Sequence, residues 1–430
     1  MLSLIHSLCP TVLAAVTLLG VANAQGQAPL LPLSNDSSIS FELLVSLGEA
    51  IYGGADIAPI LGAALDITPG NFSGFSNTFR ILADATKAAA QDPTNAYDLI
   101  NVRDTWFSAS DYYRRADFYL HSNWSDPLIY TYWQEQTAAF DNGIAALPVP
   151  GKRIQISADN FTIEAIWFAT SLEDTKKPTL ILGTGYDNAQ EDLYHTLVVP
   201  ALARGYNCLT YEGPGQPSVV RGQHLGFIPE WERVVTPIVD YLLTDLAPQV
   251  DASRLALLGY SFGGYLAARA AAFEPRLSAV LLDGGVWDFY SGIIKQIPAN
   301  LQDLYTSGNK SAFDAAVLGI LNDDTAPSTA RWGLAQGLWS FQLTSPYDFI
   351  NATKAYALKD VASQIQMPVW IANSEYDGYF PGQAQVVAAA IGENAVVHNF
   401  TGVAGNHCQI GANQELSRTV FAWLHQTLNN

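Results

Sequence analysis

Ser261 is the residue best suited to chemistry, because it stands in the run Gly259-Tyr260-Ser261-Phe262-Gly263. An apolar stretch precedes this run and an alanine-rich stretch follows it, which predicts a strand, a sharp turn and a helix. At such a nucleophile elbow the serine backbone is strained, and glycines on either side avoid collisions with the neighbouring strand and helix. The pattern G-x-S-x-G is common by chance, so its meaning depends on partners elsewhere in the chain.

A serine hydroxyl needs a general base, and the base needs an acceptor that fixes its tautomer. Three histidines follow Ser261 in the chain. We predict His407 as the base, because it lies in a glycine-bearing loop between the last predicted strand and the last predicted helix. His398 falls inside a strand pattern, and His425 lies near the end of the last helix, where a cation suits the helix dipole.

For the acid, we predict Asp377, which follows the expected strand 369–372 in the run NSEYDGYFP. Catalytic groups gather at the carboxyl ends of parallel strands, and this loop is at such an end. Asp283 also ends a predicted strand and remains a second candidate. Glu375 is interpreted as a solvated loop charge, although it is a further substitute.

An oxyanion hole is expected to combine the backbone N–H of Phe262 with the N–H of Tyr186. Tyr186 lies in the loop Gly183-Thr-Gly-Tyr-Asp187 after a predicted strand, and an ordinary strand-to-helix turn is the alternative interpretation. The glycine-rich run YEGPGQ at 211–216 lacks a following Gly-Lys-Ser/Thr, so it indicates a turn that shapes the pocket. Metal-binding spacing such as H-E-x-x-H is absent, so we expect neither a metal nor another cofactor.

Periodicity divides the mature chain into two parts. Residues 25–150 show helical patterns and predict an N-terminal helical cap module, in which one apolar face is expected to carry Ile81, Leu82, Ala85, Ala88 and Ala89. Residues 151–430 alternate strands with helices and contain a helical insertion at about 286–360. This alternation predicts a mostly parallel sheet covered by helices on both faces. Together with the G-x-S-x-G turn and the chain order of serine, acid and histidine, it indicates an α/β-hydrolase fold.

Residues 1–24 predict a signal peptide, because they contain no charged Lys, Arg, Asp or Glu and end in the small-x-small pattern Ala22-Asn23-Ala24. A membrane anchor is the alternative, but the apolar run at 11–22 is too short to span a bilayer. Seven N-x-S/T sequons agree with secretion. Cys208 and Cys408, which remain after removal of the signal, are expected to be separate thiols.

The formal charge of -19 and the 49% hydrophobic content indicate an acidic, well-packed globular protein. Such a surface repels nucleic acid and anionic membranes, so neither is an expected partner. The expected partner is a small-molecule acyl, ketone or ester substrate, and a homodimer is left open.

Several motifs together resemble one family. They are GTGYDNAQED at 183–192, YEGPGQ at 211–216, GYSFGG at 259–264, RWGLAQGLWSF at 331–341 and SPYDF at 345–349. This combination, with the helical amino-terminal module, resembles the 2,6-dihydropseudooxynicotine hydrolase-like branch of α/β hydrolases, and it is similar to fungal polyketide-shortening hydrolases of pigment biosynthesis. The resemblance implies a serine hydrolase with a helical cap that cleaves a carbon–carbon bond next to a ketone.

The apparent signal peptide and the sequons depart from the intracellular members of that family, which leaves the substrate open. A secreted enzyme with the same three residues is an esterase, lactonase or transesterase in the alternative interpretation. The rival of another class is a non-catalytic binding protein on the same scaffold. The presence of Ser261, Asp377 and His407 argues against that rival.

Overall fold

The centre of the molecule is a sheet of eight strands in the order β1-β2-β4-β3-β5-β6-β7-β8. This arrangement comes from a computed structural model that describes residues 28–429, so the predicted signal peptide at 1–24 lies outside the described residues. The strands are β1 (Lys152–Ser157), β2 (Thr162–Phe168), β3 (Lys177–Gly183), β4 (Asn207–Glu212), β5 (Val250–Tyr260), β6 (Ala279–Asp283), β7 (Val369–Ser374) and β8 (Ala395–Phe400). β1 and β2 pair antiparallel, β2 joins β4 antiparallel, and the other pairs are parallel.

Strand β5 shows why the strands have continuous apolar sequences. Leu255 and Leu257 contribute to the core on one face of the sheet, whereas Ala256 and Leu258 contribute to the core on the other face. Side chains alternate between faces along a strand, and here both faces are covered, so every position must be apolar. The predicted α/β-hydrolase fold, with helices on both faces of a mostly parallel sheet, is confirmed.

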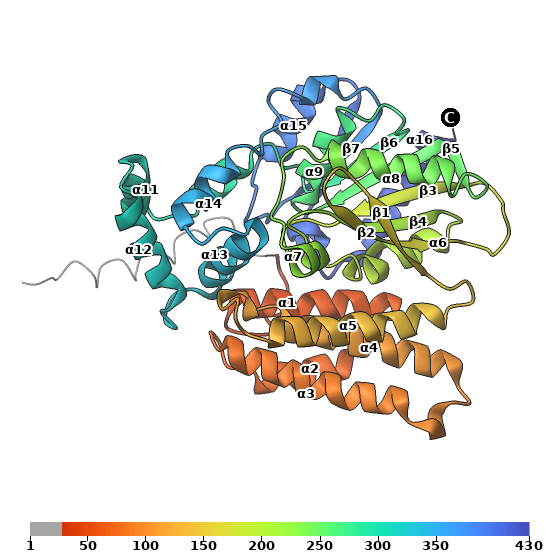
Figure 1. The fold of residues 1–430 in the computed structure, drawn as a ribbon, viewed down its shortest axis with the longest axis horizontal. Helices are drawn as coiled ribbons and strands as arrows, with labels where there is room; N and C mark the ends of the chain where they lie inside the picture. The colour runs from red at the N-terminus through yellow and green to blue at the C-terminus, as the bar shows by residue number, and fades with distance from the viewer. Residues whose placement is uncertain (1–27, 430) are drawn as a thin grey trace, which may run out of the picture.

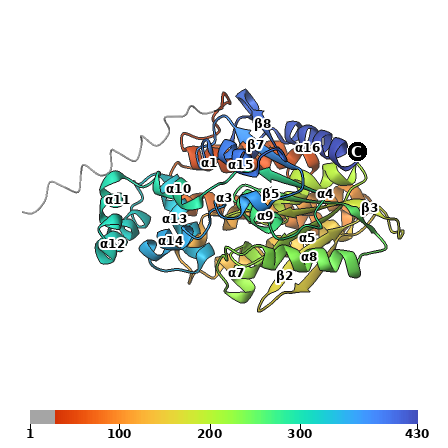
Figure 2. The same cartoon turned by 90° about the horizontal axis from the view of Figure 1, so that it is seen from above.

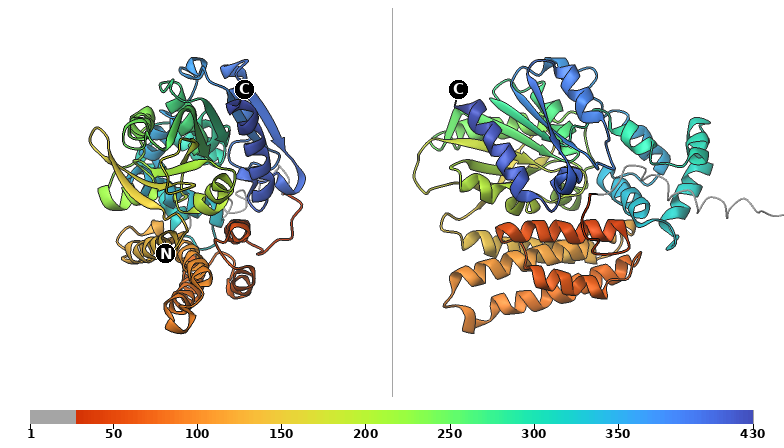
Figure 3. Two further views of the ribbon diagram at one scale, coloured as in Figure 1. Left: turned by 90° about the vertical axis from the view of Figure 1, so that its right-hand side faces the viewer. Right: turned by 180° about the vertical axis from the view of Figure 1, so that it is seen from behind.

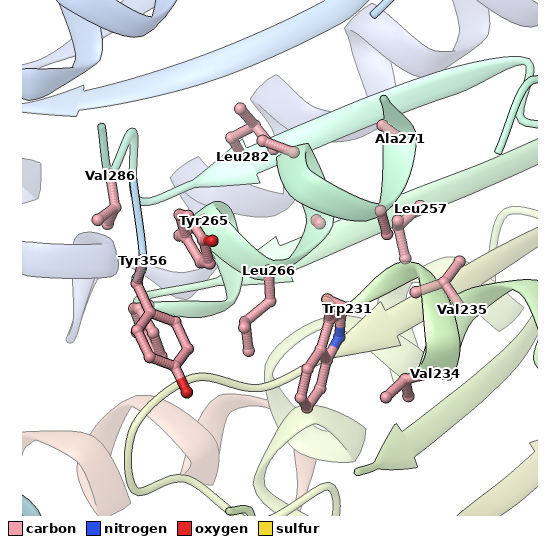
Figure 4. Close-up of a cluster of buried hydrophobic side chains, with 14 of the residues drawn as sticks. Trp231, Val234, Val235, Leu257, Tyr265, Leu266, Ala271, Leu282, Val286 and Tyr356 are labelled. Atoms are coloured by element: carbon pink, nitrogen blue, oxygen red, sulfur yellow. The ribbon is translucent and has the colours of Figure 1, made fainter. Parts of the chain in front are cut away.

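Two sets of helices cover the sheet. The elements are α6 (Val199–Leu202), α7 (Pro217–Gln223), α8 (Glu232–Thr244), α9 (Gly263–Ala271), α15 (Gln383–Ile391) and α16 (Asn413–Leu428). Helices α8, α9 and α15 pack in one core cluster, and Figure 4 shows Val235 of α8 near Leu257 of β5 and Leu266 of α9 near Trp231. Helices α6 and α16 contribute to the opposite cluster, and Figure 2 shows α16 along the edge of the molecule near β8.

Residues before the first strand form a separate layer of helices beneath the sheet, visible in red and orange in Figures 1 and 3. They are α1 (Ser37–Glu49), α2 (Ile57–Asp66), α3 (Phe72–Gln91), α4 (Leu99–Asp117) and α5 (Leu128–Ala145). Phe75 and Phe79 of α3 pack against Tyr112 of α4 in the core of this layer. The domain boundary at about residue 150 stays a prediction, although α5 ends and β1 begins on either side of it.

The apolar face predicted for α3 is wrong except at Leu82, which is partly buried against the core of the helical layer. Ile81 is 53% exposed, and Ala85 and Ala88 are also on the surface. The buried face is instead the one that carries Phe75 and Phe79, because these large rings bury much more apolar area than alanines do.

Five further helices lie between β6 and β7 and project from one end of the molecule (Figure 1). They are α10 (Phe289–Ile294), α11 (Ala299–Thr306), α12 (Lys310–Leu321), α13 (Ser328–Phe341) and α14 (Pro346–Thr353). Trp332 of α13 stacks on Phe118 at 5.6 Å between ring centroids, so this insertion contacts the N-terminal helices as well as the sheet domain. No helix in residues 28–429 is both long enough and apolar enough to cross a membrane.

Buried charges connect the N-terminal helices to the rest of the protein. Arg115 of α4 donates to Glu42 of α1 at 2.8 Å and to Asp192, beyond β3, at 3.1 Å. Arg221 of α7 likewise pairs with Asp117 of α4 at 2.5 Å. Burial raises the pKa of Glu42 to about 8, even though Arg115 acts in the opposite direction. The junction therefore holds a carboxyl group that keeps its proton at neutral pH.

The raised pKa of Glu42 makes stability depend on pH. The folded protein holds a proton on Glu42 that the unfolded chain releases near pH 4.5, so the free energy of unfolding falls as pH rises from there to about 8. Glu42→Gln removes this titrating group. With each unit rise in pH, the free energy of unfolding of this variant should fall by about 1.4 kcal/mol less than that of the wild type. Denaturant titrations between pH 5 and 7.5 measure both slopes. The exposed Glu173→Gln is the control, and equal slopes in the wild type and Glu42→Gln would contradict the prediction.

Candidate active site

Ser261 occupies a tight turn between β5 and α9. Its φ is 59°, in the left-handed region, and its N–H donates to the carbonyl of Asp283 at the end of β6 at 2.6 Å. The turn brings helix α9 so close to the next strand that a Cβ on Gly264 would lie 1.8 Å from the carbonyl oxygen of Gly284. Only glycine fits at that distance, so Gly264, the second glycine after Phe262, is required by this contact.

His407 lies against Ser261, with its Nε2 atom 2.8 Å from the serine Oγ. The histidine is buried in the loop between β8 and α16, and the ring of Tyr379 packs against it edge-on at 4.8 Å. Cys408 follows with a φ of 51°, and its thiol contacts the carbonyl of Asp283 at 3.3 Å. This second strained turn holds the histidine loop against the end of β6.

Asp377 lies on the far side of His407, in the loop after β7. Its Oδ2 atom is 3.1 Å from Nδ1 of the histidine, a distance for an ion pair, although the N–H of His407 is not well aligned with the carboxylate. The other oxygen, Oδ1, accepts the N–H groups of Tyr379 at 2.8 Å and Phe380 at 3.1 Å. The carboxylate is therefore fixed by its own loop before it meets the histidine.

The two pKa shifts in this pair agree with an ionic interaction. Burial by itself raises the pKa of Asp377, but His407 and the two backbone donors lower it, and the net shift is downward. Burial lowers the pKa of His407, but Asp377 raises it most strongly among the neighbouring charges, and the net shift is upward. The site therefore stabilises the imidazolium that forms when His407 accepts a proton.

The other candidate acids are placed differently. Asp283 is fully buried, and burial raises the pKa of its carboxyl group to about 7. Within residues 28–429, His407 forms its ion pair with Asp377 and none with Asp283. Glu375 is exposed and accepts the N–H of Gly402 at 2.8 Å. The structure thus brings together Ser261, His407 and Asp377.

The loop after β3 lies beside the serine. A Cβ on Gly185 would lie 2.7 Å from the backbone nitrogen of Phe262, so the two backbones are in close contact. Among the described residues, neither the N–H of Phe262 nor that of Tyr186 has an acceptor. Both N–H groups are thus unpaired in the described part of the chain, as the donors of an oxyanion hole must be.

Helix α13 forms hydrogen bonds with Tyr186. Its hydroxyl donates to the carbonyl of Gly333 at 2.8 Å, and its carbonyl accepts from the Gln336 amide at 3.0 Å. Next to this contact, between α13 and the N-terminal helices, is a small pocket that opens to solvent. Its lining is rich in aromatic side chains, among them Phe72, Phe118, Tyr119 and Trp332.

Two residues that support this loop were not predicted from the sequence. The Gln216 amide donates to the carbonyl and hydroxyl oxygens of Thr184 at 2.8 and 2.9 Å, so the run YEGPGQ buttresses the loop. Arg114 donates to the carbonyl of Asp187 at 2.6 Å. The run YEGPGQ was predicted to shape the pocket, which is close to the role of Gln216. No pattern in the sequence of α4 indicated the role of Arg114.

This fold and this site define a class of protein. The sequence profile described as "Alpha/beta hydrolase family" matches residues 180–409, and the chain belongs to this family. Hydrolase LUC6 from Fusarium sp is 29% identical over 415 residues, which cover 90% of this chain and 96% of that protein. The 20-hydroxy-prefusarin hydrolase FUS2 from Gibberella moniliformis is 28% identical over 404 residues, with 90% and 96% covered.

Among solved structures, 2,6-dihydroxy-pseudo-oxynicotine hydrolase superposes with a TM-score of 0.68 at 18% sequence identity. The match covers 89% of this chain and 95% of that chain. The predicted resemblance to this hydrolase and to fungal hydrolases is confirmed, and the chain is an α/β hydrolase of this kind. Both buried cysteines, Cys208 and Cys408, are free thiols as predicted.

The close approach at Gly264 yields a test of the turn. We expect Gly264→Ala to lower the free energy of unfolding by about 3 kcal/mol, because its Cβ would overlap the backbone of Gly284. Gly319→Ala in α12 is the matched control, since no atom lies within 4 Å of its Cβ, and it should be neutral or stabilising by up to about 1 kcal/mol. Chemical denaturation measures both variants, and equal effects would refute the steric argument.

Proposed function

We propose that this protein is a serine hydrolase that works through an acyl-enzyme formed on Ser261. The observation that carries the proposal is the chain of contacts from Ser261 to His407 at 2.8 Å and from His407 to Asp377 at 3.1 Å. A nucleophile, a base and an acid in this order are the parts that acyl transfer requires. The free N–H groups of Phe262 and Tyr186 supply the oxyanion hole.

The reaction we propose is the hydrolysis of a carbon–carbon bond next to a ketone in a polyketide-like or other β-dicarbonyl substrate. The motif resemblance implies this reaction class. Two similar proteins support a small organic substrate through their names, which give 20-hydroxy-prefusarin for one and 2,6-dihydroxy-pseudo-oxynicotine for the other.

The steps balance without a cofactor. His407 takes the proton of Ser261 as Oγ bonds to the substrate carbonyl, and the resulting oxyanion lies against Phe262 and Tyr186. Collapse of this intermediate breaks the carbon–carbon bond, and the electron pair moves to the second carbonyl as an enolate. The imidazolium of His407 returns the proton to carbon, and water then cleaves the acyl-enzyme with His407 again as base. The products are a carboxylic acid and a ketone.

Secretion is the second part of the proposal. Residues 1–24 carry the pattern of a signal peptide but lie outside the described residues. Six of the seven sequon asparagines are exposed, as glycosylation requires. These are Asn35, Asn71, Asn123, Asn160, Asn309 and Asn399.

The central test offers the purified protein an activated ester and a β-diketone side by side. We expect both to be hydrolysed and Ser261→Ala to hydrolyse neither. Asp377→Asn should lower kcat by about 10⁴-fold, because His407 loses the acceptor that fixes its tautomer. Initial rates by absorbance measure each reaction.

Asp283→Asn is the matched control, because this buried acid lies near His407 without pairing with it, and its kcat should stay within about tenfold of wild type. Turnover of the ester alone would overturn carbon–carbon cleavage and favour an esterase. Equal rates in Ser261→Ala and wild type would refute serine catalysis.

Expression of the full chain in a eukaryotic secretory host tests whether the protein is secreted. We expect the protein in the medium, with its first residue at Gln25 and a mass that falls after enzymatic removal of N-linked glycans. Amino-terminal sequencing and mass spectrometry measure both properties. A chain that lacks residues 1–24 is the control and should stay in the cells. An intracellular full-length product that still begins at Met1 would refute the proposal.

A further inference from the structure

A chain of buried hydrogen bonds runs from the N-terminal helices to the loop of the oxyanion hole, and the proposed steps leave it without a role. His121 lies in the 3₁₀ helix η4 (Leu120–Ser122), directly after α4. Its Nδ1 atom is 2.6 Å from Oε1 of Gln336 in α13, and Nε2 of Gln336 donates to the carbonyl of Tyr186 at 3.0 Å. Both His121 and Gln336 are buried. Two side chains thus connect the helical layer to a residue that supplies one N–H of the hole.

The neighbours of His121 assign the position of its proton. Nε2 of the imidazole lies 3.0 Å from a terminal nitrogen of Arg221, and a guanidinium only donates hydrogen bonds. Nε2 is therefore the acceptor and the proton is on Nδ1, which faces the oxygen of Gln336. Burial lowers the pKa of His121, although Asp117 acts in the opposite direction, so the imidazole is neutral at neutral pH.

This proton also decides which way the Gln336 amide points. Because Oε1 accepts from His121, the NH₂ group is the end that faces the carbonyl of Tyr186 and the hydroxyl of Ser340. The reverse orientation would place Oε1 against the carbonyl oxygen of Tyr186 and two N–H groups against each other at His121. Buried polar groups without partners are costly, so the amide is held in one orientation.

The same network holds the next carbonyl of the loop. Arg114 donates to the carbonyl of Asp187 at 2.6 Å and lies 3.6 Å from the carboxylate of Asp117. Asp117 also accepts from Arg221 at 2.5 Å, and Arg221 is the residue that contacts His121. Two successive carbonyls of the loop are therefore fixed by side chains that share one buried carboxylate. An oxyanion donor must lie within about 3 Å of its target, so a small rotation of this loop would weaken it.

We propose that His121 and Gln336 are positioning residues of the oxyanion hole: the N–H of His121 orients the Gln336 amide, and this amide holds Tyr186 where its backbone N–H reaches the oxyanion. The inference rests on the proposed acyl-enzyme mechanism and extends it to the N-terminal helices and α13. The oxyanion forms only as the reaction proceeds, so a misplaced donor lowers kcat and leaves KM nearly unchanged.

Gln336→Met and His121→Phe, assayed on an activated ester, test the proposal. Gln336→Met keeps the length of the side chain and removes the donor, whereas His121→Phe keeps a ring on Trp339, where the imidazole stacks at 5.3 Å, and removes the N–H. Each variant should lower kcat by about 10- to 100-fold with KM within about threefold of wild type. The double variant should lose no more than about threefold beyond Gln336→Met, because both residues act through one chain of contacts.

Two further variants separate positioning from general disturbance of the core. Gln136→Met is the matched control, because Gln136 is equally buried in α5 and its amide has no hydrogen-bond partner within residues 28–429. Its kcat should stay within about threefold of wild type. His121→Asn offers an N–H in place of Nδ1–H, so it should restore kcat to within about fivefold.

Binding of a trifluoromethyl ketone reports on the hole directly, because its adduct with Ser261 places an oxyanion there. The inhibition constant of this ketone should rise in Gln336→Met by the same factor by which kcat/KM falls. If His121→Phe does not fold, His121→Leu takes its place with the same expected loss of kcat, since leucine also lacks the N–H.

An equal loss of kcat in Gln136→Met and Gln336→Met would overturn the proposal, because any buried substitution would then have the same effect. A kcat in His121→Asn as low as that in His121→Phe would also overturn it, as would a rise in KM at constant kcat in Gln336→Met. If Ser261→Ala is inactive and Gln336→Met keeps the wild-type kcat, only the positioning role fails. If Ser261→Ala hydrolyses the ester as fast as the wild type, the proposed function fails first and the positioning role fails with it.

Discussion

The close approach between β5, α9 and the end of β6 is the constraint on which the site depends. The N–H of Ser261 reaches the carbonyl of Asp283 at 2.6 Å, and Gly264 touches the backbone of Gly284. This packing holds Ser261 at a positive φ, which a serine does not adopt without surrounding support. The same strand end also contacts Cys408, so one backbone segment sets both the serine and the histidine loop.

Three loops from the carboxyl ends of parallel strands then complete the site. The loop after β7 fixes Asp377 with its own backbone N–H groups, and the loop after β8 carries His407. The loop after β3 brings Gly185 against Phe262 and is supported from outside by Gln216. Loops at one edge of a rigid sheet can change their side chains without disturbing the core, which suits them to chemistry.

The N-terminal helices contribute buried charged residues and also cover part of the sheet domain. Their junction with the sheet domain buries Arg115 between Glu42 and Asp192, and a buried guanidinium is stable only where such hydrogen-bond acceptors surround it. Arg114, one residue earlier, fixes the loop of Asp187 from the same helix. Adjacent arginines thus connect the helical layer to the rest of the protein. A shift of α4 would therefore move the loop after β3.

The sequence by itself determined the sheet and the identity of the central residues. Apolar strands and the G-x-S-x-G turn are local patterns, and the chain order of Ser261, Asp377 and His407 follows from the fold that those patterns predict. Tertiary structure decided which acid meets the histidine, because Asp283 and Asp377 both end neighbouring strands and only packing separates them. It also decided which face of α3 is buried and which distant side chains, Arg114 and Gln216, hold the loop after β3, since such contacts leave no periodic trace in the sequence.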